Sequence, residues 1–324
     1  MIVLFNSNYR EIGSVDMDID IEIGTSQDAR NDFEFSTSLL DFVPYGFYID
    51  GTEYGGIIEY NYSTTEVDYH TVKGFTWRGL MSKSLILPPS GQDYKTVSGE
   101  ANEILRTMLS SVLGGFFEVP EVSSGLTINN YQFPLYINTL DGLEGMLEKY
   151  GYRLKIWASK PNHGQPVKVY VEAVQSTQIQ GAYNSDNRVP MTFTIDNMGI
   201  NHLLCAGSGE LQSRMKVDLY VNQYGQITQT QYYTGFDERT EFYDYGSAES
   251  MQDLIDGGTE KLKEVMSYKS LKIKAPQDLE LEIGDMVKGT FPDGTVLTAP
   301  IVQKIYAIVG GINIVEYKIK GEEL

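Results

Sequence analysis

Apolar and polar residues alternate with a period of two in several short segments of the chain. The clearest segment is 14–23, in which Val15, Met17, Ile19, Ile21 and Ile23 alternate with Asp16, Asp18, Asp20 and Glu22. This pattern predicts one β-strand with an apolar face and an acidic face. Similar segments, separated by glycines, run through residues 1–84 and predict antiparallel strands that close into a barrel or sandwich.

The period changes to that of a helix in residues 85–176. We expect two helices followed by two strands, at residues 100–113, 140–150, 152–158 and 167–173. Gly114 is expected to end the first helix, and Thr139 and Gly151 are expected to cap the second. Residues 85–176 therefore predict a small α+β module inserted between two β regions.

Residues 177–324 return to the strand pattern. The strands are expected at 191–195, 202–205, 215–221, 226–233, 278–283, 286–290, 302–309 and 312–319, and a helix at 247–267. Met215 begins a strand whose apolar side faces the core and whose other side carries Tyr220. Gly257 and Gly258 fall in the middle of the helix and indicate close packing, a kink or a break. The predicted fold class is α+β, mainly β, with β regions on both sides of the inserted module.

The charge balance excludes several classes of partner. The 324 residues carry a net charge of −19, and 41% of them are hydrophobic, which is normal for a packed globular protein. Residues 1–84 hold 14 acidic and 5 basic residues, about half of the excess. Binding to a nucleic-acid backbone or to an anionic membrane requires clustered cations, so neither is expected. No apolar run approaches the ~18 residues of a membrane span, and the first residues lack a signal-peptide pattern, so we expect synthesis in the cytoplasm.

Asp16, Asp18 and Asp20 have the spacing that opens a calcium-binding loop. That loop also needs a glycine at its sixth position and a glutamate at its twelfth, which are Ile21 and Gln27 here. On a strand the three carboxylates would project in a line from one face. A solvated or lumen-facing strand face is therefore favoured over a metal site.

The other candidate residues do not assemble a catalytic or metal-binding motif. The three histidines, His70, His163 and His202, have no histidine partner at helical spacing. The single cysteine, Cys205, lies in an apolar run and is interpreted as a buried small hydrophobe. Gly207-Ser208-Gly209 lacks the strand–turn–helix context of a nucleophile elbow, and Ile283-Gly284-Asp285 is interpreted as a turn with an exposed capping aspartate. We expect no catalytic residue, cofactor or metal.

The chain is rich in tyrosine, with 23 residues. The clusters are Tyr60/Tyr62, Tyr232/Tyr233 and Tyr243/Tyr245. Tyrosine is favoured in strands for packing alone, and it also supplies amphipathic contact area at interfaces. Interface contact is favoured over stacking on sugars.

Several segments together resemble the tail-hub proteins of phages and phage-like contractile particles. The resemblance covers an ordered series of weak motifs over nearly the whole chain: Val72–Met81, Ser84–Gly91, the helix 100–113, Asn201–Arg214 with its Gly-x-Gly-Glu run, and Leu279–Val287. It implies two tail-tube-like barrels, at 1–84 and 177–324, with the module 85–176 between them.

The resemblance also implies a structural role without enzymatic activity. Three chains would form a pseudo-sixfold ring that joins the tail tube or distal tail protein to a threefold spike or fibre at the tail tip or baseplate of the virion. The tape-measure protein would be a further partner, with no sequence-specific nucleic-acid binding and no stable membrane insertion. If the acidic face of segment 14–23 lined the ring, it would repel DNA and ease its passage. Family members often carry a cell-wall hydrolase domain after the hub, and we expect none after Leu324.

Two alternatives remain open at this point. A receptor- or carbohydrate-binding tail protein would use the tyrosine clusters. A cell-wall hydrolase would need a pocket with converging titratable groups.

Overall fold

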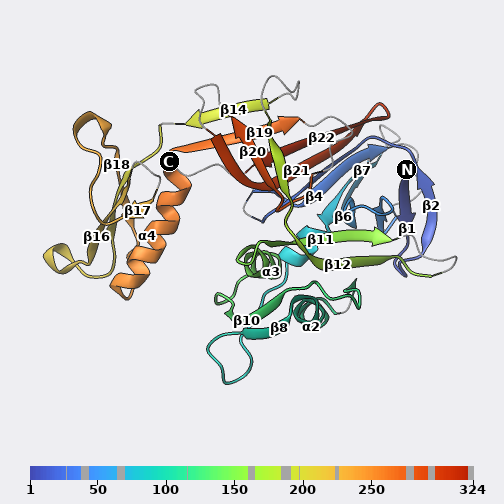
Figure 1. The fold of residues 1–324 in the computed structure, drawn as a ribbon, viewed down its shortest axis with the longest axis horizontal. Coiled ribbons are helices and arrows are strands. Elements are labelled where there is room, and N and C mark those ends of the chain that lie inside the picture. The colour runs from blue at the N-terminus through green and yellow to red at the C-terminus, as the bar shows by residue number, and fades with distance from the viewer. Residues whose placement is uncertain are drawn as a thin grey trace. The chain divides into compact units, whose positions relative to one another are not determined.

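The structure is a computed structural model of the chain. It describes residues 1–26, 28–37, 44–63, 70–114, 116–159, 165–183, 191–196, 198–222, 226–274, 281–290 and 296–319. The first unit comprises Met1–Ala182, Ile273–Lys288 and Pro300–Lys318; the second comprises Tyr183–Lys272, Gly289–Ala299 and Ile319–Leu324. Both units are drawn in Figure 1. The described residues are mainly β, as expected.

A curled antiparallel half-barrel sheet dominates the first unit. Its strands are β1 (Ile2–Phe5), β2 (Glu11–Val15), β3 (Ile19–Gly24), β4 (Asp32–Thr37), β5 (Gly46–Tyr48), β6 (Gly55–Ser63), β7 (His70–Thr76), β21 (Val296–Val309) and β22 (Ile312–Ile319). They follow the order β22-β21-β3-β4-β7-β6-β5-β1-β2. Strand β20 (Met286–Thr290) pairs with β21 and with β13 (Gln178–Tyr183).

Strands from both ends of the chain therefore share one sheet. Strand β21 pairs with β3 along six residues, with Ile305 opposite Glu22. In Figure 1 the red C-terminal strands accordingly lie beside the blue N-terminal ones. The expected arrangement of two separate barrels is not confirmed, and the boundaries at residues 84 and 176 stay predictions.

The segment 14–23 is two strands rather than one. Strand β2 pairs with β1 and β3 pairs with β21 and β4, so the chain leaves one partner and reaches another over residues 16–18. The alternation persists through this change, because Met17, Ile19, Ile21 and Ile23 are buried. The period-two pattern thus reports which side chains are buried, and it does not identify the neighbouring strand.

The helices and strands expected in residues 85–176 form largely as predicted, within the same compact unit as residues 1–84. The segment contains β8 (Thr96–Glu100), α2 (Ala101–Leu113), β9 (Phe117–Glu118), β10 (Thr127–Gln132), α3 (Thr139–Glu148), β11 (Tyr152–Ser159) and β12 (Lys168–Gln175). Gly114 ends α2 in the left-handed conformation, with φ 68°. Asn138, not Thr139, caps α3, because its side chain accepts from the backbone N–H of Asp141.

One helix of the first unit was not predicted. Residues Trp77–Ser82 form α1, where the sequence pattern indicated the end of a strand. The Thr76 hydroxyl accepts from the backbone N–H of Gly79 and so starts the helix. Trp77 and Met81 are fully buried in the core that α2, α3, β11 and β12 share, so tertiary packing fixes this short helix.

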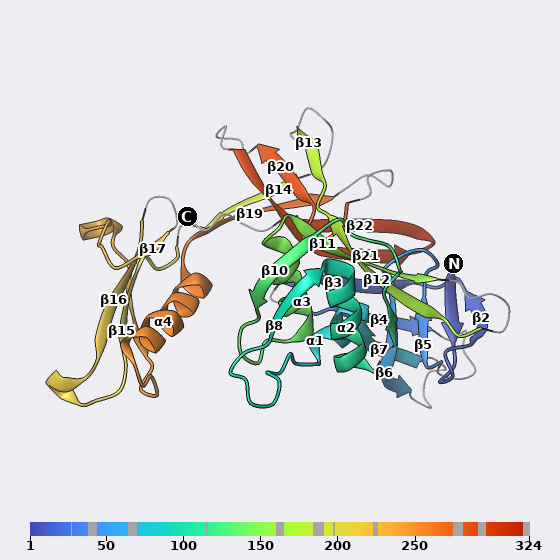
Figure 2. The same cartoon turned by 60° about the horizontal axis from the view of Figure 1, so that its bottom comes forward.

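The second unit contains a four-stranded sheet and a helix. The order is β17 (Ile227–Thr228), β16 (Lys216–Val221), β15 (His202–Ala206) and β18 (Thr240–Asp244), and α4 (Met251–Val265) packs on the sheet. Short 3-10 turns lie at Leu211–Ser213 and Gly235–Asp237, while β14 (Met191–Asp196) is the neighbour of β19 (Tyr268–Lys274). Figure 2 shows α4 running alongside β15 and β16.

The predicted apolar side of β16 is confirmed, but it packs on a helix. Leu219 and Val221 are buried with Leu254 and Leu262 of α4, and Met215 is partly buried against them. The expected returning strand 226–233 is wrong beyond Thr228. Residues 229–234 are polar or exposed, so they bury no apolar surface that would hold a longer strand in place.

The glycine pair lies inside a continuous helix. A Cβ on Gly258 would lie 2.5 Å from the Cys205 Sγ, and one on Gly257 would lie 2.6 Å from a ring carbon of Tyr245. The sequence left close packing, a kink or a break open for this glycine pair, and the structure shows close packing. The glycines let α4 approach the sheet.

Candidate functional site

The most distinctive surface of the first unit is an acidic face on β3 and β4. We define the acidic face by five carboxylates: Asp18, Asp20, Glu22, Asp32 and Glu34. Asp20 lies directly opposite Glu34 in the strand pairing. The face borders a hollow of about 630 Å³. Among the described residues, Arg30 and Lys73 are the cations that line that hollow.

The carboxylates of the acidic face repel one another. Partial burial, followed by the charges of Glu22, Glu34 and Glu316, raises the pKa of Asp20. Burial, followed by Glu22, likewise raises the pKa of Asp32. Lys73 forms an ion pair of 2.6 Å with Glu34 and neutralises one of the five charges. With five carboxylates against the two cations Arg30 and Lys73, the face carries a net negative charge near neutral pH.

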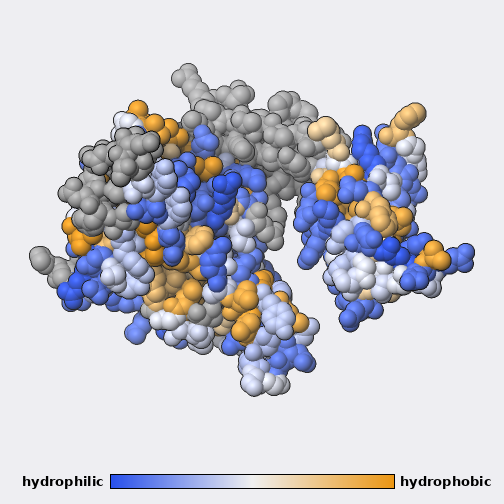
Figure 3. All heavy atoms as spheres, turned by 180° about the vertical axis from the view of Figure 1, so that it is seen from behind, coloured by the Kyte–Doolittle hydropathy of each residue, from blue (hydrophilic) through white to orange (hydrophobic). Residues whose placement is uncertain are grey.

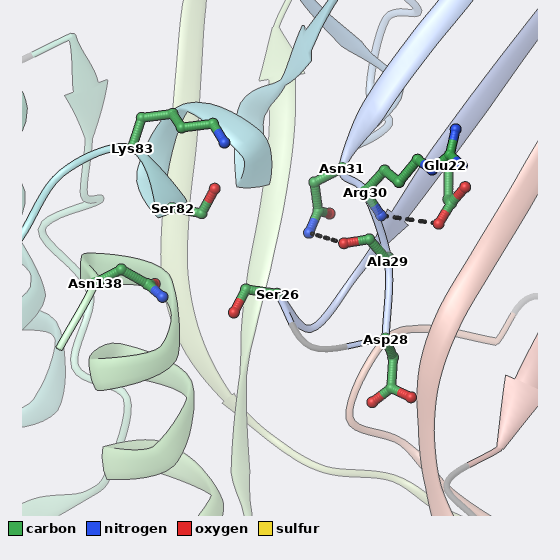
Figure 4. Close-up of a pocket in the computed structure, with 9 residues that line it drawn as sticks. All are labelled: Glu22, Ser26, Asp28, Ala29, Arg30, Asn31, Ser82, Lys83 and Asn138. Atoms are coloured by element: carbon green, nitrogen blue, oxygen red, sulfur yellow. Dashed lines mark hydrogen bonds between the residues drawn. The ribbon is translucent and has the colours of Figure 1, made fainter. Parts of the chain in front are cut away.

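A polar pocket of about 580 Å³ adjoins this face, and Figure 4 shows the residues that line it. Several of its polar groups already hold the local fold. The Asn31 side chain bonds both the N–H and the carbonyl of Gly24, at 2.8 and 3.0 Å. Asp28 pairs with Lys318 at 3.0 Å. These contacts are structural and indicate no chemistry.

The three aspartates of segment 14–23 do not converge. Asp16 lies between β2 and β3, Asp18 accepts a hydrogen bond of 2.8 Å from the backbone N–H of Gly310, and Asp20 belongs to β3. Within the part of the chain that the structure describes, no group of three acidic, histidine or cysteine side chains could hold a metal ion. The aspartates belong to a strand face and its approach.

The histidines are dispersed, and one of them has an unexpected environment. His70 begins β7, and His163 lies outside the described residues. His202 lies between two carboxylates, with its Nε2 at 2.8 Å from Asp218 and its Nδ1 at 2.7 Å from Glu238. The sequence pattern did not suggest this cluster, because its members come from separate segments that only the folded sheet brings together.

Cys205 is buried, as expected. Burial in the core beneath α4 raises the pKa of its thiol to about 11, so the reactive thiolate is scarce at neutral pH. The small-residue segment that follows is a loop held by Arg214. The guanidinium of Arg214 donates to the carbonyls of Gly207 and Ala206, at 2.8 and 3.3 Å.

Asp285 differs from its predicted role, because it is buried rather than exposed. Its carboxylate accepts from the Arg153 guanidinium at 2.7 Å and from the backbone N–H of Thr177 at 2.9 Å. It therefore ties the loop before β20 to β11. The sequence showed the turn but could not show the partly buried arginine that faces it.

The tyrosine clusters have different environments. Tyr60 and Tyr62 on β6 are about half exposed. Tyr232 and Tyr233 meet edge to face, with ring centroids 4.9 Å apart, in a segment without regular structure. The third cluster, Tyr243/Tyr245, packs against the core beneath α4. Only the first two clusters present substantial surface to a partner.

No helix in the described ranges has both the length and the apolar character that crossing a membrane would require. No protein-family model matches the chain, and no curated protein matches it.

The fold is similar to solved structures of phage tail proteins along almost its whole length. The crystal structure of the prophage MuSo2 43 kDa tail protein from Shewanella oneidensis has a TM-score of 0.52 and 12% identity, and the similarity covers 98% of each chain. The tail protein from Neisseria meningitidis MC58 has a TM-score of 0.48 and 10% identity over 98% of this chain and 95% of that chain. A topological model of the p2 virion baseplate in its activated conformation has a TM-score of 0.47 and 11% identity, over 100% and 98% of the two chains. The chain therefore has the fold of a phage tail protein, as the resemblance of its sequence segments to that group predicted.

Proposed function

We propose that this protein is a structural hub of a phage or phage-like tail tip or baseplate. Three copies form a ring that joins the sixfold tail tube, or a distal tail protein, to a threefold spike or fibre. The observation that carries this proposal is the similarity in fold to a prophage tail protein over 98% of both chains. A likeness that runs from end to end supports a shared role in the tail better than a likeness in one module would.

The acidic face supports a second element of the proposal, the passage of DNA or of the tape-measure protein through the ring. In this arrangement the acidic face of β3 and β4 lines the passage. Its negative field repels the phosphate backbone, so DNA passes without adhering to the wall. The net charge of −19 fits a protein that DNA moves past rather than one that holds it.

Assembly requires surfaces that other chains can cover, and the half-barrel sheet offers one. Strand β2 ends the sheet in the described part of the chain, and most of its residues are exposed. An edge strand carries backbone groups that can pair with another chain. The exposed Tyr60 and Tyr62 on β6 add amphipathic area to the same sheet.

The mass of the protein in solution and in particles tests the ring. A trimer of 36.4 kDa chains has a mass of about 109 kDa, which mass photometry separates from the monomer. We expect the trimer either in the purified protein or, if the free chain assembles weakly, in tail particles examined by electron cryo-microscopy. A chain that stays monomeric and is absent from tail particles would refute the hub.

Charge reversal tests the passage separately. The variant Asp20→Lys/Glu34→Lys places two cations on exposed parts of the acidic face. We expect normal folding and normal assembly, but slower DNA release from particles that carry the variant. The matched control reverses two acids outside the face, Glu241→Lys/Glu249→Lys, and should leave release unchanged. Equal release by the two variants would remove the acidic face from the passage.

A further inference from the structure

A second hollow of the first unit, with a volume of about 470 Å³, differs in character from the acidic face. Aromatic and charged side chains line it, from the turn before β6, from β11, and from β21 and β22. We call this hollow the aromatic cleft. Its volume falls within the range of ~300–1,000 Å³ that is usual for small-molecule sites.

The floor of the aromatic cleft consists of buried tyrosines. Tyr54 and Tyr306 stack with ring centroids 4.1 Å apart and an interplanar angle of 19°. Tyr317 completes the floor and is 2% exposed. Three tyrosine rings from three different elements therefore form one rigid surface.

A buried cation lies against this floor. Lys304 is only 6% exposed, and its Nζ lies 5.1 Å from the centroid of Tyr54 and 5.7 Å from that of Tyr317. Within the described residues its ammonium has one hydrogen bond, of 3.3 Å, to the Oε1 of Glu282. An ammonium has three N–H donors, and buried donors are normally all satisfied. The rings of Tyr54 and Tyr317 lie near the ammonium, and its remaining N–H groups can donate to an oxygen atom of a ligand.

The wall of the aromatic cleft carries the only tryptophan with an accessible ring. The chain has two tryptophans, and Trp77 is fully buried. Trp157 on β11 is half-buried and stacks on Tyr170, with ring centroids 5.3 Å apart. This stacking fixes the indole in place and leaves part of it toward the cleft.

The charges around the aromatic cleft are balanced, which selects against a strongly charged ligand. Each cation of the lining has an acidic partner. The pairs are Arg153 with Asp285, Lys155 with Glu172, and Lys304 with Glu282, at 2.7, 2.8 and 3.3 Å. A ligand with net charge would meet repulsion from one member of each pair.

We propose that the aromatic cleft binds a neutral saccharide. A sugar ring has flat C–H faces that can stack on the half-buried indole of Trp157, and its hydroxyl oxygens can accept from Lys304 while its hydroxyl protons donate to Glu282. An extended peptide ligand would instead form backbone hydrogen bonds with the outer edge of β11. At Ala158 that edge is already occupied, because its N–H donates to Thr52 and its carbonyl accepts from Gly51, both at 2.9 Å. The site is independent of the ring, so its failure would leave the hub proposal intact.

Tryptophan fluorescence provides a direct test, because Trp157 is the one indole near the aromatic cleft. The full-length protein is titrated with chitotriose, cellotriose and maltotriose, each up to ~10 mM, which covers millimolar affinity. We expect a saturable change in emission with at least one of them. The variant Trp157→Phe should lose this change, since Trp77 is remote from the solvent.

Two further variants separate the cleft from folding. Lys304→Met should weaken binding about tenfold through the lost hydrogen bond. Tyr94→Ala, at an exposed tyrosine outside the aromatic cleft, should bind as the wild type does. Circular dichroism verifies folding, and if Lys304→Met fails to fold, calorimetry on Trp157→Ala replaces it. The proposal is overturned if no saccharide gives a saturable response, if binding persists in Trp157→Ala, or if only an uncharged peptide, Ala-Tyr-Ala, binds.

Discussion

A buried ion cluster in the first unit yields the sharpest prediction about stability. The Arg78 guanidinium, 1% exposed, bonds the carboxylate of Glu53 through two nitrogens, and its Nη1 bonds Glu144. Glu53 lies in the turn before β6, Arg78 in the first turn of α1, and Glu144 in α3. The cluster therefore ties the half-barrel sheet to the inserted module.

Replacing Arg78 with methionine keeps most of the volume and removes the charge. Glu53, which is buried, and Glu144, which is partly buried, then lose their cationic partner within the cluster. Burial already raises the pKa of Glu53 and raises that of Glu144 to about 8, while Arg78 opposes both shifts. Breaking a buried pair in this way typically costs ~3–5 kcal/mol. Since domains are stable by only ~5–15 kcal/mol, Arg78→Met should lose a large part of the free energy of unfolding.

Urea denaturation at pH 7, followed by circular dichroism, measures this loss. The deficit should shrink at pH 5, because Glu53, whose pKa is raised by burial, takes up a proton more readily there and the neutral acid no longer needs the guanidinium. Glu144, with a pKa of about 8, is already largely protonated at pH 7. The triple variant Arg78→Met/Glu53→Gln/Glu144→Gln should recover most of the stability, since it removes all three charges together. Lys73→Met is the matched control: its ion pair with Glu34 is about half exposed, so no measurable loss is expected.

Two results would refute this reasoning. An Arg78→Met protein within ~1 kcal/mol of the wild type at pH 7 would mean that water reaches the carboxylates and replaces the guanidinium. A deficit of the same size at pH 5 and pH 7 would assign the loss to packing rather than to charge.

Four further changes test other parts of the fold. The variant Gly258→Ala should lower the midpoint of urea unfolding. Overpacking against Cys205 costs ~1–3 kcal/mol, which outweighs the ~1 kcal/mol gained in helix propensity. A higher midpoint would contradict the close contact. Met215→Asp should abolish folding of the second unit, and a normal circular dichroism spectrum would disprove its inward orientation. Tyr220→Ala should fold normally and lower the yield of assembled particles, and wild-type yield would remove Tyr220 from the interface. The raised pKa of Glu144 means that the folded state binds more protons than the unfolded state between pH 4.5 and 8, so the free energy of unfolding falls as pH rises through that window. Glu144→Gln should make the urea midpoint less dependent on pH in this range, and an unchanged pH dependence would refute this assignment.

The local sequence pattern predicted which side chains are buried more accurately than it predicted which strands pair with one another. Alternation marked Ile19, Ile21 and Ile23 as buried, and the helical period located α2 to within one residue. Both are local properties, since the period of a strand or helix is set by its own backbone geometry. The end of α2 at Gly114 was predictable for the same reason, because a glycine in the left-handed conformation ends a helix locally.

Pairing over long distances was beyond the sequence pattern. Strand β21 lies about 280 residues from β3 in the chain, with Gln303 bonded to Glu22, and nothing local in either segment specifies the other. The same limit applies to α1, which tertiary burial of Trp77 stabilises. It also explains why the cluster around His202 and the aromatic cleft were missed. Their members come from separate elements and meet only after the strands have paired.

The two sides of β3 and β4 contribute differently to the stability of the fold. Ile21 and Phe33 pair on the buried side of β3 and β4, and they stabilise the sheet. On the other side, Asp20 faces Glu34 directly, a like-charge pair that destabilises adjacent strands. Burial, followed by the charges of Glu22 and Glu34, raises the pKa of Asp20, and Lys73 pairs with Glu34 at 2.6 Å. The carboxylates therefore destabilise the isolated chain, and the proposed passage of DNA would give them a role. The variant Asp20→Asn/Glu34→Gln removes both charges, so it should raise the urea midpoint of the isolated protein and slow DNA release from particles. If the variant neither raises the midpoint nor slows release, this explanation of the acidic face is wrong.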